Sequence, residues 1–450
     1  MRFTAGLPAV VQRLDGRSWA GAPCTGGTID AVSVKVAVLG CLGVALIAVG
    51  LEVGAHRIAD ERRQDALDAF YATPPGIDDA SPGTVFQIES LGSAPVVGAS
   101  SFRILYRTER PDGSAAVSGA MVFVPFADAP PGGRPVLAYA HGTTGMGRGC
   151  APSRRSDPIG DDVWFAQAIA AGFVVVATDY AGLGTAGPNL YLIGESESLD
   201  IVNSVRALDH VPGADPGRKW AVYGYSQGGH SALWTGELAA TQMPERMLVG
   251  VAAAAPAADL SLIMANQWSS GVGWGVGAEV ASAWPAAYPG LDFSQVISSE
   301  GHRWTADVAD ACLRDGLPVP PLLGLIASSV GVPYFDHNPL EDPQLAAAVE
   351  AQTPKPLPAN LPLMIVQGTA DSVIPPSSNA NLQQTWCAAG SNLTMLWLGG
   401  VGHANAGKTA APIVVSWLRE RFDQPAPRPA CADVPPVVGG ASLLGDLLNR

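Results

Sequence analysis

One stretch decides how this chain is interpreted: Ala221-Val222-Tyr223-Gly224-Tyr225-Ser226-Gln227-Gly228-Gly229-His230. It begins as a short apolar run, passes through a Gly-X-Ser-X-Gly pattern and continues into a segment with helical character. Strand, tight turn and helix in this order are the context in which the pattern presents a nucleophilic serine. Side chains at positions 224 and 228 would crowd so sharp a turn. Because the chain has 52 glycines, the bare pattern could also be an ordinary turn, so the interpretation depends on partners for Ser226.

Two later segments supply those partners. A serine hydroxyl becomes a good nucleophile when a base takes its proton, and the base needs an acid to orient it. Asp371 follows a predicted buried strand, and His403 follows the next predicted strand. Serine, acid and histidine in this chain order are typical of α/β-hydrolases. The sequence therefore predicts Ser226, Asp371 and His403 as catalytic residues, with Asp259 as the alternative acid and capping of the helix near Pro375 as the structural alternative for Asp371.

The tetrahedral intermediate of acyl transfer needs two N–H donors directed at its oxygen. One is expected from the backbone of Gln227, next to the serine. The other is expected from the loop after the strand that ends at Ala140, where His141-Gly142-Thr143-Thr144-Gly145 lets the backbone turn. Within this loop Thr144 is favoured and Thr143 is the second candidate. His230 follows Ser226 too closely in sequence to act as the base and is expected to pack within its helix.

Over much of its length the chain alternates apolar strands with helical segments, which predicts a mostly parallel sheet with helices on both faces. The helical segments are Asp161–Ala171, Ser198–His210, the one after Ser226, and Pro412–Phe422. The strands are Thr84–Ser90, Phe102–Thr108, Ala115–Phe126, Pro135–Ala140, Phe173–Thr178, Trp220–Tyr223, Leu248–Ala254, Leu363–Gln367 and Leu393–Leu398. The ligand site of such a sheet lies at the carboxyl ends of its strands, where every candidate residue falls.

The alternation breaks between the nucleophile and the acid. Residues 258–359 hold four tryptophans and several Gly- and Pro-rich runs, and they predict a helical cap inserted into the hydrolase fold. The predicted organisation is a leader with a signal peptide or anchor (1–55), the first part of the core (56–257), the cap (258–359), the second part of the core (360–423) and a Pro-rich tail (424–450).

Composition limits the classes of partner. Only 15% of the 450 residues are charged and the net charge is −14, so no nucleic-acid partner is expected. Residues Val36 to Leu51 form an uncharged run, shorter than the roughly 20 residues of a spanning helix. It predicts an export signal, with an uncleaved membrane anchor and acylation of Cys41 as alternatives. No spacing typical of a zinc site occurs, so neither a metal nor a cofactor is expected.

Six cysteines are present, and two of them lie in the leader. The other four form an even set in a chain predicted to be exported, which favours two disulfides and leaves three pairings open. These four are Cys150, Cys312, Cys387 and Cys431.

From Phe70 to the tail the chain resembles the secretory lipase family typified by Candida antarctica lipase A. The stretches that carry this resemblance are His141–Gly145, Gly149–Ser153, Asp179–Gly184, Gly224–His230 and Trp386–Asn392. The resemblance implies an esterase or lipase with a helical cap that shapes an acyl tunnel. It also implies disulfides between Cys150 and Cys312 and between Cys387 and Cys431. The cap matches this family poorly, so the resemblance says least about the substrate.

The sequence thus predicts a secreted or envelope-associated serine carboxylester hydrolase, a lipase acting on triacylglycerols or other lipid esters. A substrate of this kind would also bring the protein into contact with lipid interfaces. The alternatives are a short-chain esterase, an acyltransferase acting on envelope lipids, a peptidase or amidase, and a binding protein without activity.

Overall fold

The structure is a computed structural model that describes residues 58–92, 96–159, 164–313, 327–328 and 331–424, together with 427, 429 and 431. Contacts divide the chain into two compact units, residues 1–61 and 62–450, and the sheet and its helices belong to the second. The predicted signal or anchor lies outside the described residues. Among the helices that the structure describes, none has the length and apolar character needed to cross a membrane.

The described strands form one sheet in the order β1-β2-β3-β5-β4-β6-β7-β8-β9. Strands β1 to β3 pair antiparallel, β3 pairs antiparallel with β5, and all pairs from β5 to β9 are parallel. The bounds are β1 (Val85–Ser90), β2 (Ala99–Glu109), β3 (Ala115–Pro125), β4 (Arg134–Ala140), β5 (Val174–Thr178), β6 (Pro216–Tyr225), β7 (Met247–Ala254), β8 (Leu363–Gly368) and β9 (Leu393–Leu398). The prediction of a mostly parallel sheet is confirmed.

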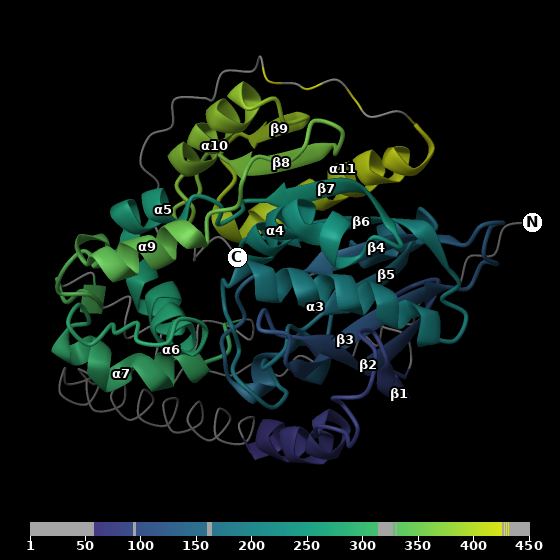
Figure 1. Cartoon of the computed structure of the whole chain (residues 1–450), viewed down its shortest axis with the longest axis horizontal. Coiled ribbons are helices and arrows are strands. Elements are labelled where there is room, and N and C mark those ends of the chain that lie inside the picture. The colour runs from purple at the N-terminus through teal and green to yellow at the C-terminus, as the bar shows by residue number, and fades with distance from the viewer. Residues whose placement is uncertain are drawn as a thin grey trace, which may run out of the picture. The chain divides into compact units, whose positions relative to one another are not determined.

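Helices cover both faces of this sheet (Figure 1). Side chains of α3, α4 and α10 belong to one apolar cluster with the sheet, and side chains of α2 and α11 belong to another. Their bounds are α2 (Phe165–Ala170), α3 (Gly194–Ala207), α4 (Gln227–Gln242), α10 (Pro376–Ala388) and α11 (His403–Asp423). The α/β-hydrolase fold predicted from the sequence is therefore the fold observed.

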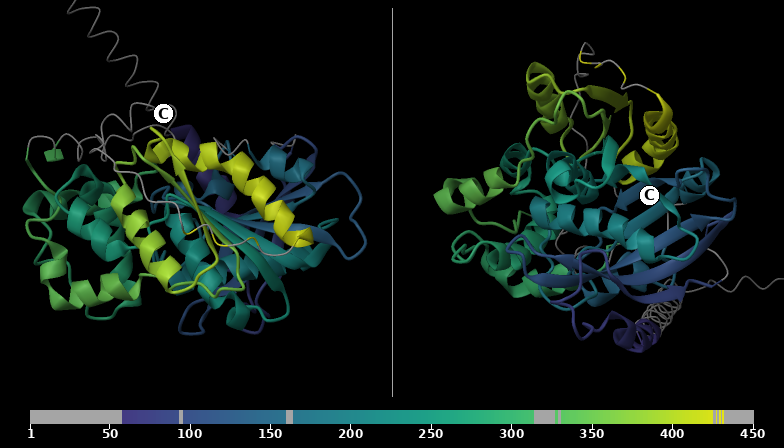
Figure 2. Two further views of the ribbon diagram at one scale, coloured as in Figure 1. Left: turned by 90° about the horizontal axis from the view of Figure 1, so that it is seen from above. Right: turned by 45° about the vertical axis from the view of Figure 1, so that its right-hand side comes forward.

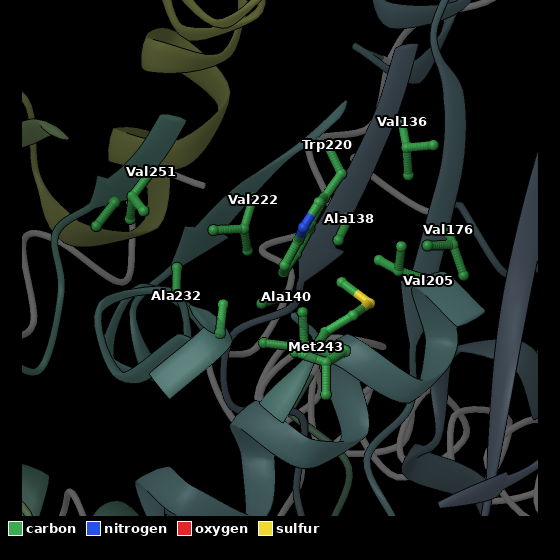
Figure 3. Packing of buried hydrophobic residues seen from close by; sticks show 14 of the residues in the cluster. Val136, Ala138, Ala140, Val176, Val205, Trp220, Val222, Ala232, Met243 and Val251 are labelled. Atoms are coloured by element: carbon green, nitrogen blue, oxygen red, sulfur yellow. The ribbon is translucent and has the colours of Figure 1, made fainter. Parts of the chain in front are cut away.

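Strand β6 shows why the central strands read as continuous apolar runs. Trp220 and Val222 enter the cluster with α3 and α4, where Figure 3 shows them beside Ala232 and Met243. The alternate residues of the same strand, Ala221 and Tyr223, enter the cluster on the opposite face. Because successive side chains of a strand point to opposite faces, a strand covered on both sides must be apolar at every position.

The helices between β7 and β8, which we call the inserted helices, lie together at one end of the sheet (Figure 2). They are α5 (Leu260–Gln267), the π-helical turn η4 (Gly273–Gly277), α6 (Ala278–Ala287), α7 (Ser299–Asp310), the 3-10 turn η5 (Pro339–Glu341) and α9 (Pro343–Ala351). They share an apolar cluster with the loop that runs from Leu190 to Ile193. Since the chain enters them after β7, they lie at the edge where the parallel strands end.

The last helix differs from its predicted extent. It was predicted over Pro412–Phe422, but α11 begins at His403. The residues before Pro412 are small and include Gly407, so they give little apolar periodicity. Gly407 has a packing role, because a Cβ there would lie 3.0 Å from the ring of Tyr225. The helix start was hidden because it packs through small residues.

Candidate active site

Ser226 occupies the turn between β6 and α4. Its φ of 56° and ψ of −117° are rare for a residue with a side chain and cost about 1–3 kcal/mol. A Cβ on Gly224 would overlap the carbonyl oxygen of Gly228, and a Cβ on Gly228 would overlap that of Ala140. The backbone N–H of Ser226 donates to the carbonyl of Ala254 over 2.9 Å. The two glycines thus allow the close packing that holds this strained turn.

His403 lies between Ser226 and Asp371. Its Nε2 is 2.9 Å from the Oγ of Ser226, and its Nδ1 is 2.8 Å from the Oδ2 of Asp371. Because an ionised carboxylate only accepts hydrogen bonds, Nδ1 carries the proton and Nε2 is left to accept from the serine hydroxyl. The three residues follow β6, β8 and β9, whose carboxyl ends meet at one edge of the sheet.

The carboxylate of Asp371 is buried and held by three donors besides His403. Its Oδ1 accepts from the backbone N–H groups of Val373 and Ile374, over 3.0 and 2.8 Å. Its Oδ2 accepts from the amide of Gln367 over 3.1 Å. The backbone bonds are those of a turn that precedes α10. Asp371 therefore both stabilises this turn, close to the capping role considered as its alternative, and contacts His403. A carboxylate with this many donors keeps a fixed orientation toward the imidazole.

Tyr225, the residue before the serine, was not singled out from the sequence. Its hydroxyl donates to the backbone carbonyl of His403 over 2.8 Å, and the two rings lie 5.2 Å apart. One side chain therefore links the turn of Ser226 directly to the first turn of α11. The only sequence signal was its place inside the Gly-X-Ser-X-Gly pattern.

The loop after β4 lies against this turn. A Cβ on Gly142 would lie 3.1 Å from the carbonyl oxygen of Tyr225. The hydroxyl of Thr143 is 2.8 Å from that of Tyr191, whereas the buried hydroxyl of Thr144 has no hydrogen-bond partner among the described residues. Gln227 is the first residue of α4, so its backbone N–H is one of the groups that a helix leaves unpaired. Gln227 is thus next to Ser226, and the loop that carries both threonines packs through Gly142 against the residue before the serine.

A buried carboxylate lies behind the serine turn and was also missed. Glu197 of α3 accepts from the side-chain amide of Gln227 over 2.7 Å and from the hydroxyl of Ser231 over 2.6 Å. It also accepts from the backbone of Leu192 over 2.9 Å. These bonds fix the first turn of α4 against the loop that contacts the inserted helices. Glu197 lies far from Ser226 in sequence, and no spacing rule connects the two.

The remaining candidates have other partners. Asp259, the alternative acid, caps α5 by accepting from the backbone of Leu262 over 2.9 Å. His230 is fully buried in α4, with its Nε2 2.8 Å from the carbonyl of Gln352. Among the described residues, no group of three or more His, Cys, Asp or Glu side chains is placed to hold a metal ion.

An apolar cavity of about 50 Å³ lies among the inserted helices. Its lining includes Leu192, which follows Tyr191, and Gln267, whose amide donates to the carbonyl of Ser372 over 2.8 Å. One lining residue, Gln267, thus connects the cavity wall to the loop that carries Asp371. Met264, Trp268 and Val276 give it walls suited to a hydrocarbon chain.

Two disulfides are formed, with the pairing that the resemblance implies. Cys150 is bonded to Cys312, and Cys387 is bonded to Cys431. The first joins the segment after the His141–Gly145 loop to the residues just after the inserted helix α7. Stable disulfides are rare in cytosolic proteins and common in secreted ones.

The sheet order and the placement of these groups at its carboxyl edge are those of an α/β-hydrolase. The sequence model of the secretory lipase family matches residues 159–428, which is more than half of the chain. This chain belongs to the secretory lipase family, a family of lipid-ester hydrolases, and a secreted protein agrees with its two disulfides.

Known relatives include proteins named as lipases and one named as a probable inactive lipase. The chain is 23% identical to Lipase A of Moesziomyces aphidis over 85% of this chain and 87% of that protein. It is 26% identical to the "Probable inactive lipase MT1628" of Mycobacterium tuberculosis over 79% of this chain and 82% of that protein. In structure it resembles Candida antarctica lipase A, with a TM-score of 0.66 and 21% identity over 85% of this chain and 93% of that one. Family membership alone therefore does not establish that this chain is active.

Proposed function

We propose that this protein hydrolyses carboxylic esters by a serine mechanism, with Ser226 as nucleophile, His403 as general base and Asp371 as the acid that orients it. The observation that carries the proposal is the unbroken line of contacts, 2.9 Å from Ser226 to His403 and 2.8 Å from His403 to Asp371. An inactive relative is no argument against activity here, because this chain has all three groups in contact.

The chemistry follows from this arrangement. His403 Nε2 takes the proton of Ser226 as its Oγ attacks the carbonyl carbon of the ester. The negative charge on the carbonyl oxygen is stabilised by the backbone N–H of Gln227 and by a donor from Thr144 or Thr143. The protonated His403 then gives its proton to the leaving alcohol, and an ester links the acyl group to Ser226. Water activated by His403 attacks this ester and releases the carboxylic acid.

We infer that residues 258–359 act as the cap and receive the acyl chain of a lipid ester in the apolar cavity. Its apolar walls support a hydrocarbon as ligand. A volume of about 50 Å³ is small beside the roughly 300–1,000 Å³ of pockets that enclose whole ligands. This observation favours a second candidate, an esterase for short acyl chains, unless the inserted helices move when a long chain binds.

Hydrolysis of p-nitrophenyl esters with acyl chains of two to sixteen carbons tests both parts of the proposal. Ser226→Ala removes the nucleophile, so we expect kcat to fall by about 10⁴-fold or more without a change in melting temperature. A maximum at long chains supports the lipase, and a maximum at two to six carbons supports the esterase. Equal, negligible rates in both proteins would contradict ester hydrolysis and favour acyl transfer or peptide cleavage.

A further inference from the structure

The loop that carries Thr143 is attached to its surroundings on both sides. Before Thr143, Gly142 packs against Tyr225. After it, the carbonyl of Thr144 accepts from the backbone of Leu313 over 3.0 Å, and the N–H of Met146 donates to Ala309 over 2.7 Å. The later part of the loop thus rests on the last turn of α7 and on Leu313 beyond it, whereas Thr143 is held by its side chain.

Tyr191 supplies that side-chain contact. Its hydroxyl is 2.8 Å from the hydroxyl of Thr143, and only 3% of the residue is exposed. Its backbone carbonyl accepts from the indole N–H of Trp284, in the inserted helix α6, over 3.0 Å. One residue of the loop between β5 and α3 therefore contacts the Thr143 loop with its side chain and an inserted helix with its main chain.

A buried carboxyl of α6 lies near this tyrosine. Burial and the proximity of Glu279 raise the pKa of Tyr191 well above its ordinary value, so its hydroxyl keeps its proton. Burial also raises the pKa of Glu279 well above the ordinary range of a carboxyl. Glu279 has no hydrogen bond to any described residue, which leaves Thr143 as the hydrogen-bonding partner of the Tyr191 hydroxyl.

Building on the proposed role of Ser226, we propose that Tyr191 is a positioning residue for ester hydrolysis. It holds Thr143 and thereby the His141–Gly145 loop, the proposed oxyanion loop, in its working conformation. The flanking glycines, Gly142 and Gly145, leave this backbone free to adopt other conformations. An N–H donor stabilises the developing charge only if it already points at the oxygen.

Tyr191→Phe tests this role, because it removes the hydroxyl and keeps the ring. A lost neutral hydrogen bond of about 1 kcal/mol corresponds to a fall in kcat of roughly fivefold. With p-nitrophenyl butyrate we expect this fall in kcat and a KM that changes by less than about twofold. Thr143→Val should have the same effect, the double variant should be no worse than either single one, and Thr143→Ser should retain more activity than Thr143→Val.

Tyr334→Phe is a matched control. Tyr334 is also buried among the inserted helices, and its hydroxyl is likewise 2.8 Å from a threonine hydroxyl, that of Thr305. It should lower the melting temperature by a similar amount and leave kcat unchanged. The proposal would be overturned by a wild-type kcat in Tyr191→Phe or by equal losses of kcat in Tyr191→Phe and Tyr334→Phe. It would also be overturned if the effects of the Tyr191 and Thr143 changes on kcat were additive. If instead Ser226→Ala retains hydrolysis, the proposed function itself fails.

Discussion

At the scale of single residues, close backbone contacts matter as much as the reactive side chains. Ser226 can stand at its turn because Gly228 lets α4 approach β4 to within contact of Ala140. No side chain longer than hydrogen fits there, because the space is taken by backbone, which cannot rotate away. The Gly-X-Ser-X-Gly pattern could be recognised from the sequence because this steric requirement is local.

Gly228→Ala should therefore destabilise the protein and abolish activity. Inserting a carbon into a closely packed site typically costs about 1–3 kcal/mol, and here the neighbouring atom is a main-chain oxygen. We expect a lower melting temperature together with loss of p-nitrophenyl ester hydrolysis. Gly275→Ala is the control, since a Cβ there meets nothing within 4 Å. Equal melting temperatures and rates for the two variants would contradict this reading of the turn.

At the scale of elements, the sequence predicted the sheet better than the segments around it. The strand residues are apolar on both faces, and this signal is local. The first turn of α11 was missed because the small residues around Gly407, which packs against Tyr225, give no apolar periodicity. The contacts of Glu197 and Tyr191 were missed because they join residues distant in sequence. The sequence of the inserted helices has no simple apolar periodicity, because these helices pack against each other and against the loop from Leu190 to Ile193.

The disulfide between Cys150 and Cys312 ties two of these elements together, and its removal should affect both stability and catalysis. The bond closes a separation of 162 residues, and loss of a native disulfide typically costs about 2–4 kcal/mol. Gly145 also packs against the backbone of Ala311, so removing the disulfide should loosen the His141–Gly145 loop, in which we propose an oxyanion donor. We expect the double change to alanine at Cys150 and Cys312 to lower both the melting temperature and kcat.

The second disulfide provides the comparison. Cys387 and Cys431 are separated by 44 residues. Cys387 lies near the C-terminal end of α10, whereas the loop that carries Asp371 precedes the N-terminal end of that helix. Replacing this pair by alanine removes the same number of sulfur atoms. We expect a lower melting temperature and an unchanged kcat. An equal loss of kcat in both double variants would show that catalysis follows general stability and not the attachment of the oxyanion loop.

At the scale of the whole molecule, stability depends on buried acids as well as on apolar packing. Asp179 is fully enclosed beyond the end of β5, where it accepts from the backbone and the hydroxyl of Ser153. Burial raises its pKa to about 6, although the bonds from Ser153 and the charges of Arg103 and Arg154 act in the opposite direction. The unfolded chain gives the same group an ordinary pKa near 3.8.

This difference in pKa predicts the direction in which the stability effect of Asp179→Asn changes with pH. Between about pH 4 and pH 6 the folded protein binds more protons at Asp179 than the unfolded chain does, so the stability due to this group falls as pH rises. The free energy of unfolding of the wild type minus that of the Asn variant should therefore decrease as pH rises through this range. The decrease should be about 1.4 kcal/mol for each unit of difference between the folded and unfolded pKa, and the value should become constant above about pH 7. Urea unfolding of both proteins at each pH measures this difference.

Asp112→Asn is the control. Hydrogen bonds from Ser114 lower the pKa of this exposed carboxyl, so its contribution to stability should not change above about pH 4. A difference for Asp179→Asn that stays constant, or grows with pH, would mean that this carboxyl is already ionised in the folded protein under mildly acidic conditions.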